Sequence, residues 1–274
     1  MNATAAELSP RTFQRFCALV YEKAGIHLGP QKEALVAARM GKRMRALGVG
    51  SYEDYYQFVK EDATGGELVE MLNAISTNVT YFFREERHFH LLEQLLKKWN
   101  HGGQDSFRIW SAAASTGQEP YSIAMTARAA LGAGGEVKIL GTDISTRALD
   151  VGRAGRYERR HLEKVPESYV RRFFRKERDG ATGEDEYRID EDLRRMATFA
   201  RLNLAEPPYP MKGPFDVVFC RNVMIYFDNR VRKALLDEIW RLLKPGGYLL
   251  VGHAESLSGM LSHFRSVEPS VYVK

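Results

Sequence analysis

Two apolar segments of the sequence each end in polar residues, and the two ends lie about 30 residues apart, as neighbouring strands do in nucleotide-binding folds. The first segment runs into small residues at 111–117 and Glu119, and the second, at 138–142, ends at Asp143. In such folds an acidic residue at the end of the second strand accepts hydrogen bonds from both ribose hydroxyls. The pattern predicts that Asp143 binds the ribose of an adenosine-containing cofactor.

The loop at 112–117 indicates which adenosine cofactor fits. It contains alanines and only one glycine, Gly117, so it lacks the Gly-x-Gly-x-x-Gly spacing that brings a backbone close to a pyrophosphate. A cofactor without phosphates therefore fits better than NAD. S-adenosylmethionine (SAM) is such a cofactor, because it joins adenosine to a sulfonium and an amino-acid tail.

The elements that must position these loops follow from the apolar pattern further along the chain. A buried strand at 215–220 ends in the polar pair Arg221 and Asn222, and leucines in helical register follow it. Lys-Pro-Gly-Gly at 244–247 ends that helix, and a second apolar strand occupies 248–252. Strand, helix and strand in this order predict an α/β fold with a doubly wound parallel sheet.

At this point the sequence resembles the chemotaxis receptor glutamate O-methyltransferases, the CheR family. The resemblance is carried by the blocks at 77–85 (TNVTYFFRE), 110–122 (WSAAASTGQEPYS), 219–228 (FCRNVMIYFD), 243–248 (LKPGGY) and 252–256 (GHAES), together with Asp143. It implies a Rossmann-like class I methyltransferase sheet in residues 101–274. It also implies a small all-helical receptor-docking domain in residues 1–75, a linker helix at 76–100 and a small antiparallel β insertion at about 169–200.

The resemblance implies a site residue by residue. The cofactor-binding positions are Asn78, Thr80, Arg84, Glu119, Asp143, Asn203, Leu204, Arg221 and Asn222. Arg84 and Tyr226 are the catalytic candidates, because they would orient the incoming glutamate. A glutamate carboxylate is already ionised at pH 7 and the sulfonium is a good leaving group, so transfer needs alignment rather than a general base. The product would be S-adenosylhomocysteine.

A basic helix is expected near the N-terminus. Arg39, Lys42, Arg43 and Arg45 lie within seven residues, beside an apolar stripe that includes Leu47. The pattern alone is equally consistent with a solvated face. The resemblance implies that these cations bind the acidic helices of a methyl-accepting receptor, in a contact that weakens with salt.

The segment 169–203 is not needed by a plain doubly wound sheet. Its charges and glycines predict two short strands around a loop, and the resemblance implies that Gly183 and Arg188 help to bind a C-terminal receptor tail. An exposed hairpin without a partner remains the alternative.

Composition, charge and cysteine content bear on where the protein acts and what it binds. The 274 residues have a net charge of +5 and a pI near 9.1, and basic and acidic residues are interspersed. The first 20 residues lack a basic start followed by an apolar core, and no apolar run reaches 18 residues. We therefore expect a cytoplasmic protein without a signal peptide or membrane insertion. Cys17 and Cys220 are far apart and His253-x-Glu255 is typical of structural roles, so no disulfide or metal site is expected. Nothing requires more than a monomer.

Two other functions stay open from the residues. A methyltransferase acting on nucleic-acid bases would suit the basic pI, but such enzymes usually place Pro-Pro-aromatic after the strand-end Asn or Asp. Here Val223 and Met224 follow Asn222, so no nucleic-acid partner is expected. A non-catalytic adaptor would bind the cofactor through Asp143 and dock receptors without transferring methyl groups.

Overall fold

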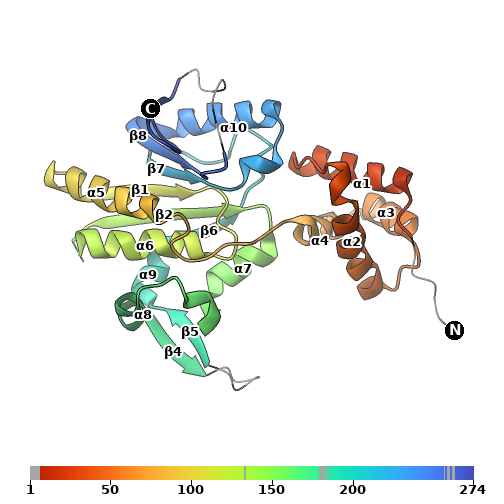
Figure 1. The fold of residues 1–274 in the computed structure, drawn as a ribbon, viewed down its shortest axis with the longest axis horizontal. Coiled ribbons are helices and arrows are strands. Elements are labelled where there is room, and N and C mark those ends of the chain that lie inside the picture. Colours follow the sequence, from red (N-terminus) through yellow and green to blue (C-terminus); the bar gives the residue numbers. More distant parts are fainter. Residues whose placement is uncertain are drawn as a thin grey trace.

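The N-terminal part of the chain forms a helical domain that stands beside a larger α/β domain (Figure 1). The computed structural model describes residues 7–132, 134–178, 183, 185–255, 257, 260 and 263–274. The helical domain comprises α1 (Pro10–Ala24), the 3-10 turn η1 (Pro30–Lys32), α2 (Glu33–Leu47), α3 (Tyr52–Glu61) and α4 (Gly66–Ile75). The hydroxyls of Ser9 and Ser51 cap α1 and α3 by accepting backbone N–H groups, which explains where these helices begin.

The apolar stripes predicted from helical spacing form the core of this domain. Phe16, Met40 and Tyr55 are fully buried in one cluster. Leu47 is the exception, since it lies in the last turn of α2 with 37% of its surface exposed.

The larger domain is built on a seven-stranded sheet, which confirms the predicted doubly wound class. In the order β6-β2-β1-β7-β8-β10-β9, its strands are β6 (Ala197–Arg201), β2 (Glu136–Asp143), β1 (Ser106–Ser111), β7 (Phe215–Cys220), β8 (Leu243–Val251), β10 (Val271–Val273) and β9 (Arg265–Glu268). The first five are parallel, and β10 is antiparallel to both of its neighbours.

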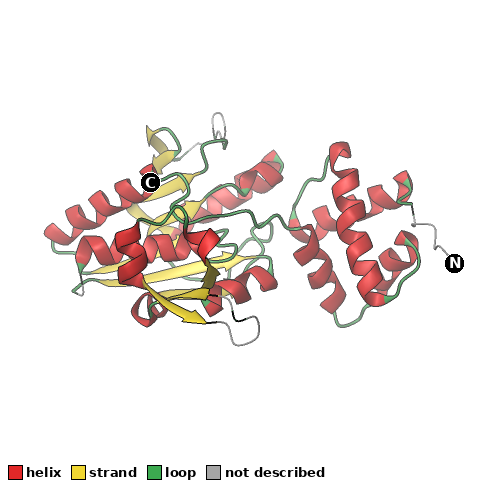
Figure 2. Ribbon diagram, turned by 60° about the horizontal axis from the view of Figure 1, so that its bottom comes forward, coloured by secondary structure: helices red, strands yellow, loops and turns green. Residues whose placement is uncertain are grey.

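Helices cover both faces of this sheet (Figure 2). They are α5 (Arg87–His101), α6 (Gln118–Leu131), α7 (Thr146–Ala154) and α10 (Asn229–Leu242). Because successive side chains of a strand point to opposite faces, Ile109 and Phe219 lie in the apolar cluster beneath α5 and α6. Trp110, Val218 and Cys220 lie in the cluster beneath α10. Burial on both faces accounts for the continuous apolar runs in the sequence.

The insertion is a three-stranded antiparallel sheet rather than a pair of strands. It contains β3 (Arg156–Glu158), η2 (Arg159–Leu162), α8 (Glu167–Phe173), β4 (Phe174–Arg178), β5 (Asp185–Ile189) and α9 (Glu191–Met196), with β5 in the centre. The predicted bounds of about 169–200 therefore miss β3, and they include most of β6, which belongs to the main sheet. The loop predicted around Gly183 lies mostly outside the described residues.

The linker differs from the predicted helix at 76–100. Residues 76–86 form no helix, and α5 begins only at Arg87. Phe83 and Glu85 have φ of 55° and 57°, a left-handed backbone that cannot continue an α-helix. Phe82, fully buried, contacts the rings of Tyr157 and Phe174 and so fixes the linker to the insertion. None of the helices in the described part of the chain is long and apolar enough to cross a membrane.

The helical domain is held against the α/β domain at the loop after α1. The backbone N–H of His27 donates to the carbonyl of Tyr226 at 2.8 Å, and the amide of Asn203 donates to the carbonyl of Lys23 at 2.8 Å. The hydroxyl of Tyr21 donates to Asp228, which itself caps α10. Residues close to the strand ends thus face residues of the helical domain.

Candidate active site

A pocket opens where the carboxyl ends of β1, β2 and β7 meet the linker and the helical domain. Its space is about 1120 Å³ including the open mouth, enough for a ligand the size of a modified nucleoside. The chain leaves β1 towards β2 on one side and reaches β7 on the other, and ligands of open α/β sheets bind at this change of strand order.

The structure brings all the cofactor-binding and catalytic candidates together around this pocket. They are Asn78, Thr80, Arg84, Glu119, Asp143, Asn203, Leu204, Arg221, Asn222 and Tyr226. The linker, the ends of β2, β6 and β7, the first turn of α6 and a 3-10 turn contribute these residues, so no local sequence pattern alone could group them. The helical domain adds residues that sequence reasoning missed, among them Ile26, His27 and Lys32.

Asp143 ends β2 and faces the pocket with an already ordered carboxylate. One oxygen accepts the backbone N–H of Ser115 at 2.8 Å, and the other accepts the N–H of Ser145 at 2.9 Å. Burial raises the pKa of this carboxyl above its ordinary value, while the two N–H groups oppose that shift. A carboxylate offers about four acceptor positions, so further donors can still be bound.

Gly117 explains how the preceding loop fits so closely beneath the pocket. Its φ is 94°, and a Cβ atom would lie 2.8 Å from the Cα of Gly152 in α7. Only glycine is compatible with both observations. The loop therefore packs against α7 instead of approaching a phosphate.

Glu119 lies in the first turn of α6 and lines the pocket. Its Oε1 accepts the hydroxyl of Ser111 at 2.7 Å, and its Oε2 lies 3.6 Å from Nη1 of Arg221. Burial raises the pKa of the Glu119 carboxyl, and the attraction of Arg221 opposes the shift. In its ionised form this carboxylate is suited to a positively charged ligand group.

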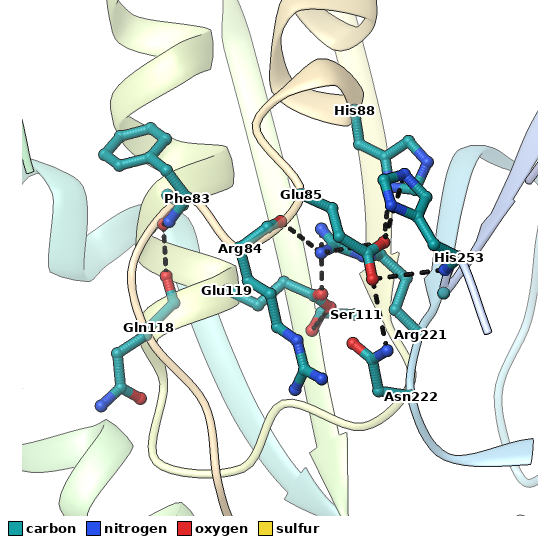
Figure 3. A network of polar contacts seen from close by, with 12 residues as sticks. Phe83, Arg84, Glu85, His88, Ser111, Gln118, Glu119, Arg221, Asn222 and His253 are labelled. Carbon is teal, nitrogen blue, oxygen red and sulfur yellow. Dashed lines mark hydrogen bonds and ion pairs between the residues drawn. The ribbon is translucent and has the colours of Figure 1, made fainter. Parts of the chain in front are cut away.

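Arg221, predicted as a cofactor-binding residue at the end of a strand, lines the pocket and also contacts several protein groups. Its guanidinium is almost fully buried, donates to the carbonyl of Arg84, and lies between Glu119 and Glu85 (Figure 3). The distance to Oε2 of Glu85 is 3.5 Å. The rings of Phe89 and Phe219 complete its surroundings. Arg221 therefore connects the linker to the pocket wall.

Two carboxylates that sequence reasoning did not assign to the site hold its loops. Glu85 accepts the amide of Asn222 and the backbone N–H of His253, both at 3.3 Å. Burial disfavours its ionisation, but Arg221 and these donors outweigh burial and leave the pKa of Glu85 below its ordinary value. Glu255 accepts four backbone N–H groups, from Gly252, Asn222, Met224 and Ile225.

Glu255 explains the shape of the chain after β7. Asn222 has φ of 59°, a strained conformation for a residue with a side chain, and its N–H is held by Glu255 at 2.7 Å. The His-x-Glu pattern thus includes a structural carboxylate, as the sequence suggested. The shape of the loop that Glu255 holds is seen only in the structure.

Arg84 and Tyr226, the two orienting candidates, occupy separate walls of the pocket. Nη1 of Arg84 donates to the carbonyl of Val79 at 3.1 Å, within the linker. Tyr226 lies in the 3-10 turn η3 (Met224–Tyr226), before α10, and its carbonyl accepts His27 from the helical domain. Arg84 is therefore held within the linker, whereas the turn that carries Tyr226 contacts the helical domain.

Asn203 and Leu204, two of the predicted cofactor-binding residues, also make structural contacts. The side chain of Asn203 bonds to the carbonyl of Lys23 and to the N–H of Ala205, so it fixes the loop after β6. Leu204 is buried and, with Leu202 and Ile144, gives this end of the pocket an apolar lining.

The basic helix α2 does not present all four of its predicted docking cations. Arg43 makes two hydrogen bonds to Glu67, at 2.7 and 2.6 Å, and Arg39 donates to the carbonyls of Ile75 and Ser76. Their guanidinium groups therefore stabilise the helical domain and the start of the linker. Lys42 and Arg45 are exposed and remain candidates for a docking surface.

The tail-binding candidates lie on the insertion, away from the pocket. Arg188 is in the central strand β5, with Nη1 3.6 Å from Glu177. Gly183 has φ of 72°, and its carbonyl accepts a hydrogen bond from Arg178 at 3.0 Å. Residues 179–182 and 184 of this loop lie outside the described residues.

The residues of the pocket fit SAM. Asp143 offers acceptors for two hydroxyls, Glu119 offers a buried negative charge, Leu204 belongs to an apolar end, and the loop at Gly117 makes no phosphate cradle. A doubly wound sheet with such a pocket at its switch point defines a SAM-dependent methyltransferase.

Comparison with known families agrees with this class. The family profile described as "CheR methyltransferase, SAM binding domain" matches residues 78–273, and "CheR methyltransferase, all-alpha domain" matches residues 11–76. The chain belongs to the CheR methyltransferase family.

Curated relatives match over nearly the whole chain. The "Chemotaxis protein methyltransferase" of Salmonella typhimurium is 39% identical over 97% of this chain and 90% of its own length. "Chemotaxis protein methyltransferase 2" of Pseudomonas aeruginosa is 40% identical over 95% and 91%. The "Chemotaxis protein methyltransferase" of Borreliella burgdorferi is 34% identical over 100% and 96%.

Proposed function

We propose that this protein transfers the methyl group of SAM to glutamate side chains of methyl-accepting chemotaxis receptors, forming glutamate methyl esters and S-adenosylhomocysteine in the cytoplasm. One structural observation supports the proposal in addition to family membership. The pocket lies between a methyltransferase sheet and a separate helical domain, so a protein substrate can contact both. When bound, SAM supplies a methyl group on a positively charged sulfur.

The cofactor is held by charges of complementary sign. Asp143 accepts the ribose hydroxyls, and Glu119 binds the positively charged end of the amino-acid portion. Each charge-assisted hydrogen bond contributes roughly 1.5–3 kcal/mol before the cost of desolvation. Asn78, Thr80 and Arg84 come from the linker and bind the carboxylate of the amino-acid portion, while Leu204 packs against the adenine.

Positioning is the main catalytic contribution of the protein. The substrate carboxylate loses no proton, so the pocket needs no general base for the transfer. Arg84 and the hydroxyl of Tyr226 orient this carboxylate and replace part of its water. Fixing two reactants in a reactive geometry can supply several kcal/mol of the barrier, on the order of 7–11 kcal/mol in favourable cases.

The substrate is recognised outside the pocket as well. Lys42 and Arg45, exposed on α2, attract the acidic surface of receptor helices. Arg188 and Gly183 of the insertion bind a C-terminal receptor tail in receptors that have one. A pull-down with receptor fragments that carry or lack the tail tests this part, because equal capture of both contradicts it.

The function is tested by asking which macromolecule receives the methyl group. Purified protein is incubated with SAM labelled in its methyl group and with either a receptor cytoplasmic fragment or double-stranded DNA. Label on the receptor alone is the expected result. Label on DNA would instead identify a nucleic-acid methyltransferase, and cofactor binding without transfer to either would identify an adaptor.

A further inference from the structure

Glu85, His88 and His253 bring three potential metal ligands together beside the pocket. Oε2 of Glu85 lies 3.5 Å from Nδ1 of His88 and 3.9 Å from Nε2 of His253. One ligand atom from each residue can be chosen so that all lie within 4.8 Å of one another. The side chains come from the linker, from the first turn of α5 and from the loop after β8 (Figure 3).

The hydrogen bonding of His88 is unusual. Its side chain is 1% exposed, and among the described residues no group hydrogen-bonds to either ring nitrogen. Buried polar atoms nearly always have a partner, and one imidazole with two unpartnered nitrogens therefore requires an explanation. Burial also lowers the pKa of His88 to about 4, so at neutral pH the ring carries a lone pair.

The carboxylate of Glu85 also has one buried oxygen without a partner. Its Oε1 accepts two hydrogen bonds, from Asn222 and from the N–H of His253, whereas its Oε2 has no hydrogen-bond partner among the described residues. Ligating carboxylates are typically oriented by such bonds to the other oxygen. His253 is 57% exposed, which leaves a path from solvent to the cluster.

We propose that Glu85, His88 and His253 form a binding site for a divalent transition-metal ion, with zinc as the best match. Two imidazoles and one carboxylate are a set of ligands that zinc accepts, with a fourth position open to water. Ligand atoms about 2.0–2.1 Å from a tetrahedral ion lie about 3.3 Å apart. The Glu85–His88 distance is already close to this value, and the exposed His253 can approach with a small side-chain movement.

Arg221 limits the affinity of this site and connects it to the pocket. Its Nη2 lies 3.5 Å from the same Oε2 of Glu85, so a bound cation is repelled by the guanidinium and competes with it for the carboxylate. Arg221 also contacts Glu119 in the pocket wall. We therefore expect metal binding and cofactor binding to weaken each other, by the same factor in both directions.

The site is tested with Co²⁺, whose visible absorption reports its coordination, and with Zn²⁺ in calorimetry. Full-length protein freed of metal should bind one Zn²⁺, and Co²⁺ should give the intense bands of a tetrahedral site. His253→Ala should weaken binding by at least tenfold. Because this side chain is exposed, the variant should fold as the wild type does, and a thermal melt checks that it does. His90→Ala, an exposed histidine of the same helix, is the matched control and should bind as the wild type does.

Two outcomes would overturn the proposal. Equal Zn²⁺ affinity in wild type, His253→Ala and His90→Ala would mean that the metal binds elsewhere. Absence of the tetrahedral Co²⁺ bands in the wild type would mean that the three side chains do not bind an ion together. The coupling is overturned separately if saturating S-adenosylhomocysteine leaves the Zn²⁺ affinity of the wild type unchanged.

Discussion

Arg43 provides a sharp test of the division between structural and docking cations on α2. Its guanidinium makes a two-bond ion pair with Glu67, and the exposed fractions of the two side chains are 20% and 6%. Arg43→Met leaves the Glu67 carboxylate buried with only the hydroxyl of Tyr55 as a donor, at 2.8 Å. Breaking a buried ion pair costs about 3–5 kcal/mol.

The partial exposure of Arg43 reduces this cost, because water can reach the carboxylate once the guanidinium is removed. We expect a loss of about 2–3 kcal/mol in the free energy of unfolding. For a protein of this size that loss lowers Tm by roughly 5–10 °C. Thermal unfolding followed by circular dichroism measures the change.

Lys42→Met, at the neighbouring exposed position, is the matched control and should leave Tm within about 1 °C. The double variant Arg43→Met, Glu67→Met should lose less than the sum of the two single variants, because no unpaired charge is buried. An unchanged Tm for Arg43→Met, with slower receptor methylation, would refute the reasoning and return Arg43 to the docking surface.

Four further results are expected. Asp143→Asn should weaken SAM binding in calorimetry by about 10- to 100-fold, because either orientation of the amide points NH₂ at a backbone N–H; affinity within twofold of wild type would contradict this role. Since burial raises the pKa of Asp143, SAM affinity should start to fall at a higher pH than the ordinary aspartate pKa of about 3.9 would cause. The same group makes the unliganded protein more stable as pH falls, because the folded state takes up the proton first. A SAM affinity that stays flat down to the ordinary aspartate pKa would count against this role. Gly117→Ala should lose at least about 2 kcal/mol of stability from its positive φ and its contact with α7, and an unchanged urea midpoint would show that the loop can move. Lys42→Met should slow methylation of receptor fragments mainly at low salt, and equal slowing at all salt concentrations would exclude electrostatic steering.

The parallel strands could be predicted because each one has a local pattern in the sequence. Each parallel strand is buried on both faces and therefore appears as an apolar run, and the polar residue that ends it, such as Asp143 or Asn222, lies at the ligand edge. The antiparallel strands β9 and β10 were not predicted. They are only four and three residues long, too short for alternation to be recognised.

Side-chain partners far apart in the sequence could not be predicted in this way. Helical periodicity shows which side of α2 carries Arg43, but only the folded domain shows Glu67 opposite to it. Glu85 and Glu255 are similar cases, since their role depends on left-handed backbone at Asn222 and on a loop from another strand. The strand β3 was missed because three residues form it and its partner lies about 30 residues later.

The central claim is that the transferred methyl group becomes a carboxyl ester of a receptor glutamate. The most direct measurement labels a purified receptor cytoplasmic fragment from methyl-labelled SAM and treats the isolated receptor with mild base. The account predicts that the label is released as volatile methanol, and that Asp143→Asn lowers the yield when SAM is limiting. Label that stays on the receptor after base treatment would show methylation of another group and contradict the account.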